Sequence, residues 1–393
     1  MVRCLLLFVS LIILWKCSIN EGKPSIIFVP GFLCSLLEIR INTTIQTKCP
    51  KSIDNQWILL WLNLRLFQPE YFLCFHEIFQ LIYNETSMNF ENPPGIQTRL
   101  LTNSSKSSFL NGLLWEYIGL DQFLFHFLFK HQYEDGINIR SISYDFRRGT
   151  NESLNEFCQR LKELIEITYL TNKNEKISLI SHSLGGSMTL NFLNQQNEIW
   201  KEKYIHSWIS LSGNLAGGID NIQSLIQGFV SPLIPKTILQ TWDFYSWRLP
   251  NSFIYGTKRI LIESPKKNYS SNDFFDFLNQ LGAKQLAQVY LKSSLILSTF
   301  SPPNVNTFCF FGTNISTPIK YISTSNTFHG KLSILYGSGD GELDDTNNYS
   351  CQLWNQTMDP KYQLTIKSFP YVTHVGLLSN SNLLRQIDQI LFN

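Results

Sequence analysis

A serine in a tight turn is the residue most able to do chemistry in this chain. Residues 181–186 read Ser-His-Ser-Leu-Gly-Gly, directly after the apolar run 177–180 and before a stretch with helical spacing. A serine between a strand and a helix is typical of a nucleophile elbow, so Ser183 is predicted to attack an acyl carbon. Gly185 provides the small residue that the elbow needs two positions later, whereas Ser181 stands where glycine is commoner. The alternative is a Ser/Gly turn that only closes a strand onto a helix.

A histidine must take the proton of such a serine, and a carboxylate must orient that histidine. In elbow enzymes the chain order is serine, acid, histidine. His374 follows the last apolar run and precedes the final helical pattern, so it is the predicted base. His206 and His329 adjoin other strand candidates, and we interpret them as surface residues.

The predicted acid is Asp340, which lies between two glycines just after the apolar run 332–336. Glu342, Asp344 and Asp345 follow in the same loop, and we interpret them as a solvated acidic segment. Their spacing does not match a calcium-binding EF-hand loop. The sequence therefore predicts a triad of Ser183, Asp340 and His374, with no metal site and no cofactor.

An oxyanion hole needs two backbone N–H groups aimed at the developing negative oxygen. One is expected from Leu184, directly after the nucleophile, and the other from Phe32. Phe32 lies in the segment Pro30-Gly31-Phe32-Leu33 behind the first apolar run, where Gly31 allows a sharp turn.

Short apolar runs alternate with helical patterns along the chain, which favours an α/β fold with a mostly parallel sheet covered on both faces. We expect strands at 25–29, 137–144, 177–181, 208–212, 332–336 and 364–368, and helices near 157–170 and 188–192. Residues 217–330 break this rhythm and are predicted to form a cap or lid insertion above the sheet.

Composition excludes several classes of protein. The 393 residues carry a net charge of only +2, with 16% charged and 14% aromatic residues. The chain is too apolar for intrinsic disorder and too neutral for a nucleic-acid binder. Residues 1–20 have the basic start and short apolar run of a signal peptide, with a retained signal anchor as the alternative. The body of the protein is then a single domain over 21–393, secreted or delivered to the lysosomal lumen.

Cysteine and asparagine usage agree with export. Six cysteines remain in the body, an even number in an oxidising compartment. Asn-X-Ser/Thr acceptors for glycosylation occur at Asn42, Asn84, Asn103, Asn151, Asn268, Asn314, Asn348 and Asn355. We expect about half of them to carry glycans.

Several short motifs occur along the chain in an order that is typical of one protein family. They are Phe28-Val29-Pro30-Gly31, Asn92-Pro93-Pro94-Gly95-Ile96-Gln97, Tyr144-Asp145-Phe146-Arg147, His182-Ser183-Leu184-Gly185, Gly339-Asp340-Gly341, Cys351-Gln352-Leu353-Trp354 and His374. In this order they resemble the lecithin:cholesterol acyltransferase and lysosomal phospholipase A2 family of α/β-hydrolases. The resemblance implies a lipase-like monomer that moves an acyl chain from a glycerophospholipid through Ser183 to water or to a lipid alcohol, such as a sterol or ceramide.

The resemblance also implies residue pairings. Asp340 matches the family's triad acid. Cys49–Cys74 and Cys309–Cys351 match its two disulfides, which leaves Cys34 and Cys158 free, with a Cys34–Cys158 bond as the alternative. Asp145 and Arg147 are interpreted as a structural ion pair. Trp242, Phe244, Tyr245 and Trp247 fall in the region that resembles the family's mobile lid, or in the core.

The loop closed by Cys49 and Cys74, within 42–80, is rich in large apolar residues. A helix that exposes them would insert shallowly into a phospholipid membrane or lipoprotein surface. The predicted contacts are Trp57, Leu60, Trp61 and Leu64, and the alternative is an ordinary core helix.

Departures from the family pattern concern the acid loop and the loop of Phe32. Glu342 and Leu343 stand where the family usually continues its acid loop differently, and Phe32 replaces a polar or small residue. A neutral-lipid or sterol-ester lipase is one alternative function. A catalytically inactive lipid-binding protein with the same fold is another.

Overall fold

A computed structural model describes residues 23–46, 48–100, 120–229, 233–293 and 300–392. The proposed signal peptide and the acceptor Asn103 lie outside these ranges. The centre of the molecule is a six-stranded sheet in which every pairing is parallel. Its order is β15 (Leu364–Pro370), β12 (Thr307–Thr313), β9 (Ile205–Leu211), β8 (Ile177–His182), β1 (Ser25–Val29) and β7 (Ile139–Ser141).

Alternate residues of these strands face two different cores, because successive side chains of a strand point to opposite faces. In β1, Ile27 and Val29 join one core, and Ile26 and Phe28 join the other. The first face is covered by α6 (Asn151–Thr171), α7 (Leu184–Gln195) and α8 (Glu198–Tyr204). The second face is covered by α5 (Leu120–Phe125), η3 (His126–Lys130), η6 (Gly376–Ser379) and α16 (Ser381–Phe392). This arrangement is the expected α/β-hydrolase core.

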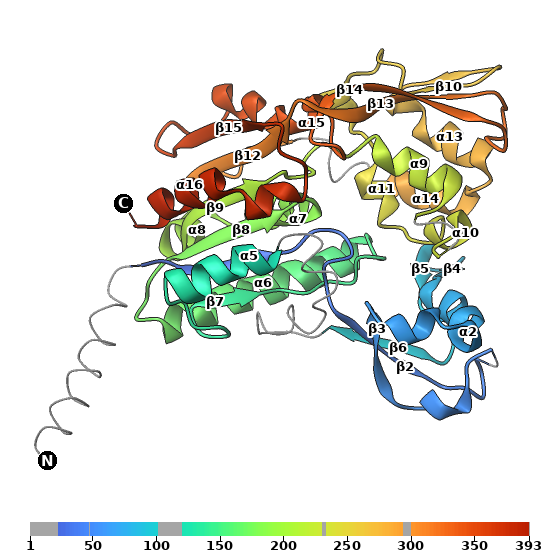
Figure 1. The fold of residues 1–393 in the computed structure, drawn as a ribbon, viewed down its shortest axis with the longest axis horizontal. Coiled ribbons are helices and arrows are strands. Elements are labelled where there is room, and N and C mark those ends of the chain that lie inside the picture. The colour runs from blue at the N-terminus through green and yellow to red at the C-terminus, as the bar shows by residue number, and fades with distance from the viewer. Residues whose placement is uncertain (1–22, 47, 101–119, 230–232, 294–299, 393) are drawn as a thin grey trace, which may run out of the picture.

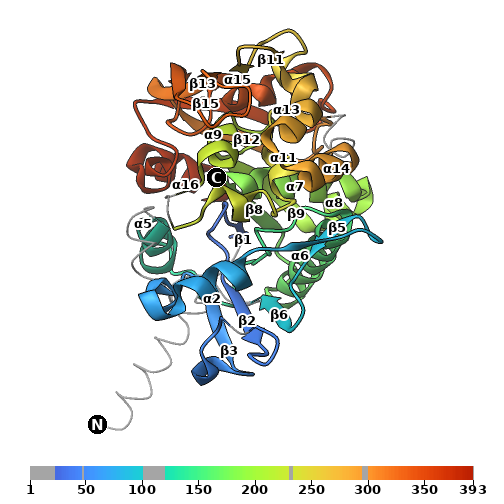
Figure 2. The ribbon, with the colours of Figure 1, turned by 90° about the vertical axis from the view of Figure 1, so that its right-hand side faces the viewer.

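A small subdomain follows β1 and is drawn in blue in Figure 1, beside the cap. Its antiparallel sheet orders β3 (Trp57–Trp61), β2 (Leu37–Ile41) and β6 (Ile96–Leu100), and the pair β4 (Ile82–Asn84) and β5 (Asn89–Glu91) lies apart. The Cys49–Cys74 disulfide ties the loop near η1 (Lys51–Ile53) to α2 (Pro69–Phe79), with η2 (Leu64–Phe67) between β3 and α2. Figure 2 looks onto α2, β2 and β3.

The cap contains most of the segment between β9 and β12. Its helices are α9 (Asp220–Gln227), α10 (Lys236–Leu239), α11 (Tyr245–Arg248), α12 (Ser252–Tyr255), η4 (Ser271–Asp273), α13 (Phe274–Leu281) and α14 (Lys284–Ser293). Its sheet orders β11 (Asn268–Tyr269), β10 (Ile262–Glu263), β13 (Ile315–Ser323) and β14 (Leu332–Gly339). The chain then passes through α15 (Asp345–Asn348) and η5 (Ser350–Gln356) to β15.

Two predictions about the arrangement of strands were wrong. The segment 217–330 is not one insertion, because residues 307–313 inside it form the central strand β12. The run 332–336 is a strand, but β14 pairs with β13 in the cap sheet rather than joining the central sheet. Both errors have one cause: a short apolar run predicts a strand without specifying which sheet it joins.

Candidate active site

The turn after β8 holds Ser183 in a strained conformation. Its backbone has φ 52° and ψ −122°, outside the regions that residues with a side chain favour. A Cβ on Gly185 would lie 2.2 Å from the Val29 carbonyl oxygen, so only glycine fits there. A Cβ on Gly31 would lie 3.1 Å from the Cβ of Ser183. The β1 loop therefore passes directly against the serine, as a nucleophile elbow requires.

The serine at position 181 has a structural role. Its hydroxyl oxygen accepts a hydrogen bond of 2.8 Å from the indole Nε1 of Trp208, and both side chains are fully buried. A buried indole N–H without an acceptor would cost free energy. Ser181 therefore replaces the commoner glycine because β9 places a tryptophan beside it.

Asp340 and His374 form a buried pair. The His374 Nδ1 and the Asp340 Oδ2 lie 2.8 Å apart, and the His374 backbone N–H donates to the Asp340 carbonyl at 2.7 Å. The other carboxylate oxygen accepts from the backbone N–H groups of Glu342 at 3.1 Å and Leu343 at 2.8 Å. These contacts fix the imidazole so that its Nε2 is free to act. Among the described residues Nε2 has no hydrogen-bond partner.

The acid reaches this position by an indirect route. After the central strand β12 the chain leaves through the β13–β14 hairpin, and only then returns to Asp340. A Cβ on Gly312, in β12, would lie 3.1 Å from the Cβ of Asp340. The hairpin therefore returns the acid beside the central strand from which it started.

The charges around His374 favour its protonated form. Burial opposes the imidazolium, but the carboxylates of Glu342 and Asp340 outweigh that effect, so the pKa of His374 is raised. For Asp340, burial opposes the carboxylate, and the His374 pair with the hydrogen bonds from Leu343 and Glu342 outweighs it, so its pKa is lowered. The sequence predicted Glu342 only as part of a solvated acidic segment, but in the structure its Oε2 lies 3.6 Å from the His374 Nε2.

His182 supports this pair, a role that the sequence reasoning missed. Its Nε2 lies 3.2 Å from the His374 carbonyl oxygen, and the two rings are 4.9 Å apart between centroids. Burial first, and then the charge of His374, lower the pKa of His182 to about 3, so it is neutral. The position of His182 directly before the candidate nucleophile Ser183 was the available signal.

The predicted oxyanion donors lie on two segments that adjoin the serine. Leu184 is the first residue of α7, where backbone N–H groups have no intrahelical acceptor. Phe32 lies in a turn closed by the Cys34 N–H, which donates to the Gly31 carbonyl at 3.2 Å. The next residue, Leu33, has φ 60°, and its carbonyl accepts from the Trp61 Nε1 at 2.7 Å. The subdomain therefore holds the loop that carries Phe32.

Comparison with known proteins places the chain in a family. The model of the lecithin:cholesterol acyltransferase family matches residues 57–295, more than half of the chain. The chain belongs to this family. It is 25% identical to "Lysosomal phospholipase A and acyltransferase" of Homo sapiens, over 98% of this chain and 95% of that protein. It is 26% identical to "Phosphatidylcholine-sterol acyltransferase" of Gallus gallus, over 94% of this chain and 90% of that protein.

A solved structure supports the fold alone. The chain aligns with one from the crystal structure of the Tle4–Tli4 complex with a TM-score of 0.53 and 10% identity, over 95% of this chain and 99% of that chain. Together with the parallel central sheet, this likeness agrees with the α/β-hydrolase fold.

The disulfides implied by the family resemblance are present. Cys49 bonds to Cys74 and Cys309 bonds to Cys351, whereas Cys34 and Cys158 are free, so the alternative Cys34–Cys158 bond is excluded. The predicted ion pair is present too: Arg147 is fully buried and its Nη2 lies 2.8 Å from the Asp145 Oδ2.

Half of the predicted membrane contacts were wrong. Residues 57–61 form the strand β3 rather than a helix, and Leu60 and Trp61 are 0% and 5% exposed. The Trp61 ring stacks on Phe79 at 5.6 Å. Trp57 is half-buried beneath Arg99, whose guanidinium lies 4.3 Å from its ring. Only Leu64, in η2, is exposed, at 51%.

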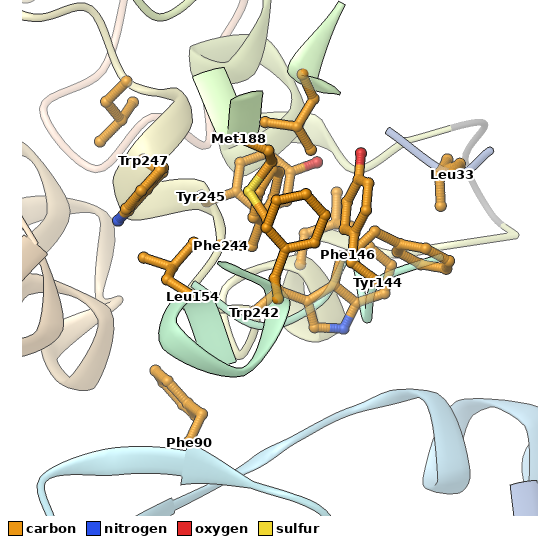
Figure 3. Packing of buried hydrophobic residues seen from close by; sticks show 14 of the residues in the cluster. Leu33, Phe90, Tyr144, Phe146, Leu154, Met188, Trp242, Phe244, Tyr245 and Trp247 are labelled. Atoms are coloured by element: carbon orange, nitrogen blue, oxygen red, sulfur yellow. The ribbon is translucent and has the colours of Figure 1, made fainter. Parts of the chain in front are cut away.

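The aromatic residues of the lid-like region are core residues. Trp242, Phe244, Tyr245 and Trp247 are all buried. Figure 3 shows Trp242, Phe244 and Tyr245 gathered beside Phe146. They surround the half-buried Phe32 ring, which stacks on Phe244 at 5.6 Å, with the Arg248 guanidinium 4.2 Å from its centroid. The large residue at position 32 therefore packs the loop after β1 against the cap.

The glycan acceptors differ in access. Asn348 is buried, and its amide donates to the carbonyls of Gly312 and Leu343, so a glycan there is incompatible with this fold. Asn268, Asn314 and Asn355 are exposed, and Asn42 and Asn84 are partly exposed. Asn151 begins α6.

Proposed function

We propose that this protein is a phospholipase A and O-acyltransferase that forms an acyl intermediate on Ser183. The observation that carries the proposal is the buried His374–Asp340 pair, 2.8 Å apart. It contacts the strained serine turn through His182, whose Nε2 lies 3.2 Å from the His374 carbonyl oxygen, in a chain of the lecithin:cholesterol acyltransferase family. The relatives carry names of phospholipases and acyltransferases, which supports a glycerophospholipid as acyl donor.

In the first half-reaction His374 Nε2 takes the Ser183 hydroxyl proton while the serine oxygen attacks the ester carbon of the donor. The N–H groups of Phe32 and Leu184 stabilise the negative oxygen. When the intermediate collapses, the ester C–O bond breaks and His374 gives its proton to the leaving lysophospholipid oxygen. Asp340 stays ionised throughout and holds the Nδ1–H of His374.

In the second half-reaction an acceptor hydroxyl replaces the lysophospholipid. His374 takes the acceptor's proton, the acceptor oxygen bonds to the acyl carbon, and the Ser183 oxygen leaves with the proton from His374. Water as acceptor gives a free fatty acid, and a lipid alcohol such as a sterol or ceramide gives an ester. One site therefore performs hydrolysis and acyl transfer without a cofactor.

We propose that the protein is a monomer and meets phospholipid through the exposed apolar side chains of its disulfide-closed subdomain. Leu64 in η2 and Leu73 in α2 are 51% and 64% exposed. No helix in the described ranges is long and apolar enough to cross a bilayer. With residues 1–20 as a signal peptide, we propose a glycosylated enzyme of the lysosomal lumen or the extracellular space.

The test is acyl release from phosphatidylcholine liposomes by the protein and its Ser183→Ala variant. We expect the variant to lose at least about three orders of magnitude in rate. Ser333→Ala, at an exposed serine of β14, is the matched control and should keep full activity. Equal rates for the protein and Ser183→Ala would refute the proposal.

Two measurements separate the alternative functions. A strong preference for triacylglycerol or sterol ester over phosphatidylcholine would identify a neutral-lipid or sterol-ester lipase. An inactive lipid-binding protein would leave Ser183 unlabelled by a fluorophosphonate, which otherwise bonds to the serine oxygen with loss of fluoride.

A further inference from the structure

Three side chains with metal-ligating atoms meet outside the triad. His126 begins the π-helical turn η3, His131 directly follows it, and Asp388 lies on the C-terminal helix α16. Both elements cover the same face of the central sheet, where α5 and α16 are drawn in teal and dark red (Figures 1 and 2). Segments that lie 262 residues apart in the chain therefore bring imidazoles and a carboxylate together.

The three ligand atoms lie close together. The Asp388 Oδ1 lies 2.7 Å from the His126 Nε2 and 2.9 Å from the His131 Nε2. One ligand atom from each residue lies within 4.8 Å of the other two. Bonds of about 2.0–2.2 Å from zinc to nitrogen and oxygen would therefore need only small side-chain movements.

The π-helical turn is what aligns the two histidines. The backbone N–H of His131 donates to the carbonyl of His126 at 3.3 Å, a bond between residues five positions apart. In an α-helix residues at this spacing diverge, because 3.6 residues make a turn, whereas a π-helical turn places them on one face. This local backbone explains why sequence spacing alone predicted no metal site.

Hydrogen bonding does not account for the whole cluster. The Asp388 Oδ1 pairs with His126, and its Oδ2 accepts from Lys130 Nζ at 2.8 Å. The His131 Nε2 forms an ion pair with the same Oδ1 at 2.9 Å, but it is not aligned for a hydrogen bond. A buried polar atom in this state calls for an explanation, and a bound ion is one of them.

We propose that His126, His131 and Asp388 bind a divalent transition-metal ion, of which Zn²⁺ fits best. Two imidazole nitrogens and one carboxylate oxygen suit zinc, whereas calcium and magnesium prefer oxygen ligands alone. Three protein ligands leave a fourth tetrahedral position for water.

The surrounding contacts hold the ligands in place. Phe392 stacks on the His131 ring at 4.6 Å between centroids. Lys130 is 54% exposed and occupies the second carboxylate oxygen, which leaves Oδ1 to the metal. A bound ion would clamp α16 onto α5 and η3, and thus fasten the C-terminal helix to the sheet.

The experiment uses the full secreted protein, stripped of metal with a chelator and then titrated with Zn²⁺ by calorimetry and with Co²⁺ by visible absorption. We expect one bound ion for each chain and a melting temperature that rises with Zn²⁺. His126→Gln, His131→Gln and Asp388→Asn should each weaken binding by more than about tenfold and remove the thermal shift.

Controls separate this site from the other imidazoles. His329→Gln, at an exposed histidine, and His374→Ala, which removes the active-site imidazole, should both keep the bound ion. Folding of each variant is checked by circular dichroism without metal. The proposal is overturned if the unchanged protein binds no Zn²⁺ at 100-fold molar excess. It is also overturned if binding is lost in His374→Ala but kept in folded His131→Gln.

Discussion

Replacing Glu342 with glutamine is expected to lower the pKa of His374 and to move the acid limb of the pH–rate profile to lower pH. The Glu342 carboxylate faces the His374 Nε2 at 3.6 Å. This distance is too long for a hydrogen bond, so the interaction is chiefly one of charge. Without that charge the imidazolium is less stable, and the base becomes neutral at lower pH.

The size of the shift follows from distance and exposure. Opposite unit charges at about 4 Å attract by about 1 kcal/mol in water and about 4 kcal/mol at an effective dielectric constant of 20. The Glu342 side chain is 49% exposed, so the lower part of this range applies. A difference of about 1.4 kcal/mol corresponds to one pKa unit, and we therefore expect a shift of about one unit.

Other titratable groups near His374 also contribute to the pH–rate profile. Asp340 remains ionised and still raises its pKa, so the variant should keep most of its maximal rate. Burial raises the pKa of Asp220 to about 6 despite the nearby Arg248, so its titration would add a second inflection near that pH. His182 is neutral and adds no charge.

The assay is kcat/KM against pH with a short soluble ester, because this ratio reports the pKa of the free enzyme. Glu85→Gln, on the exposed turn between β4 and β5, removes the same charge far from His374 in the chain and should leave the profile unchanged. An acid limb that stays in place in Glu342→Gln, or that moves to higher pH, would refute the reasoning.

Four further predictions concern packing, the membrane-facing surface and glycans. Trp61→Ala should lower the free energy of unfolding by about 3–5 kcal/mol in urea titrations. It should also slow hydrolysis of a soluble ester, because the Leu33 carbonyl loses its hydrogen-bond donor. An effect on liposome binding alone would contradict the buried position of Trp61. Leu64→Ser should weaken liposome binding about tenfold in flotation assays with soluble-ester hydrolysis unchanged. Ser181→Gly should destabilise the fold by about 1–3 kcal/mol because the Trp208 indole N–H loses its acceptor, and an unchanged melting temperature would count against this role. Glycopeptide mapping should find Asn348 without a glycan.

The central sheet was largely predictable because strands buried on both faces are short continuous apolar runs. The runs at 25–29, 177–181 and 364–368 coincide with β1, β8 and β15. The elbow was predictable as well, because a serine turn between strand and helix has a local sequence signature. Along with the family motifs, these local features led to the candidate nucleophile Ser183 and the helix that follows it.

The positions of non-local partners were less predictable. The sequence predicted the strand β12 within the cap. It also predicted Trp61 at a membrane surface, because an apolar residue has the same sequence pattern whether protein or lipid covers it. The role of Ser181 depends on Trp208, which the sheet register brings beside it from the next strand.

By itself, the sequence determined the fold class, the family and the order of the candidate catalytic residues, since these rest on local patterns along the chain. The tertiary structure alone decided which apolar residues are covered, which sheet each strand joins, and which charges face His374. It also brought His126 and His131 beside Asp388. The physical reason is that burial, electrostatics and metal ligation depend on distances across the fold, which sequence spacing does not specify.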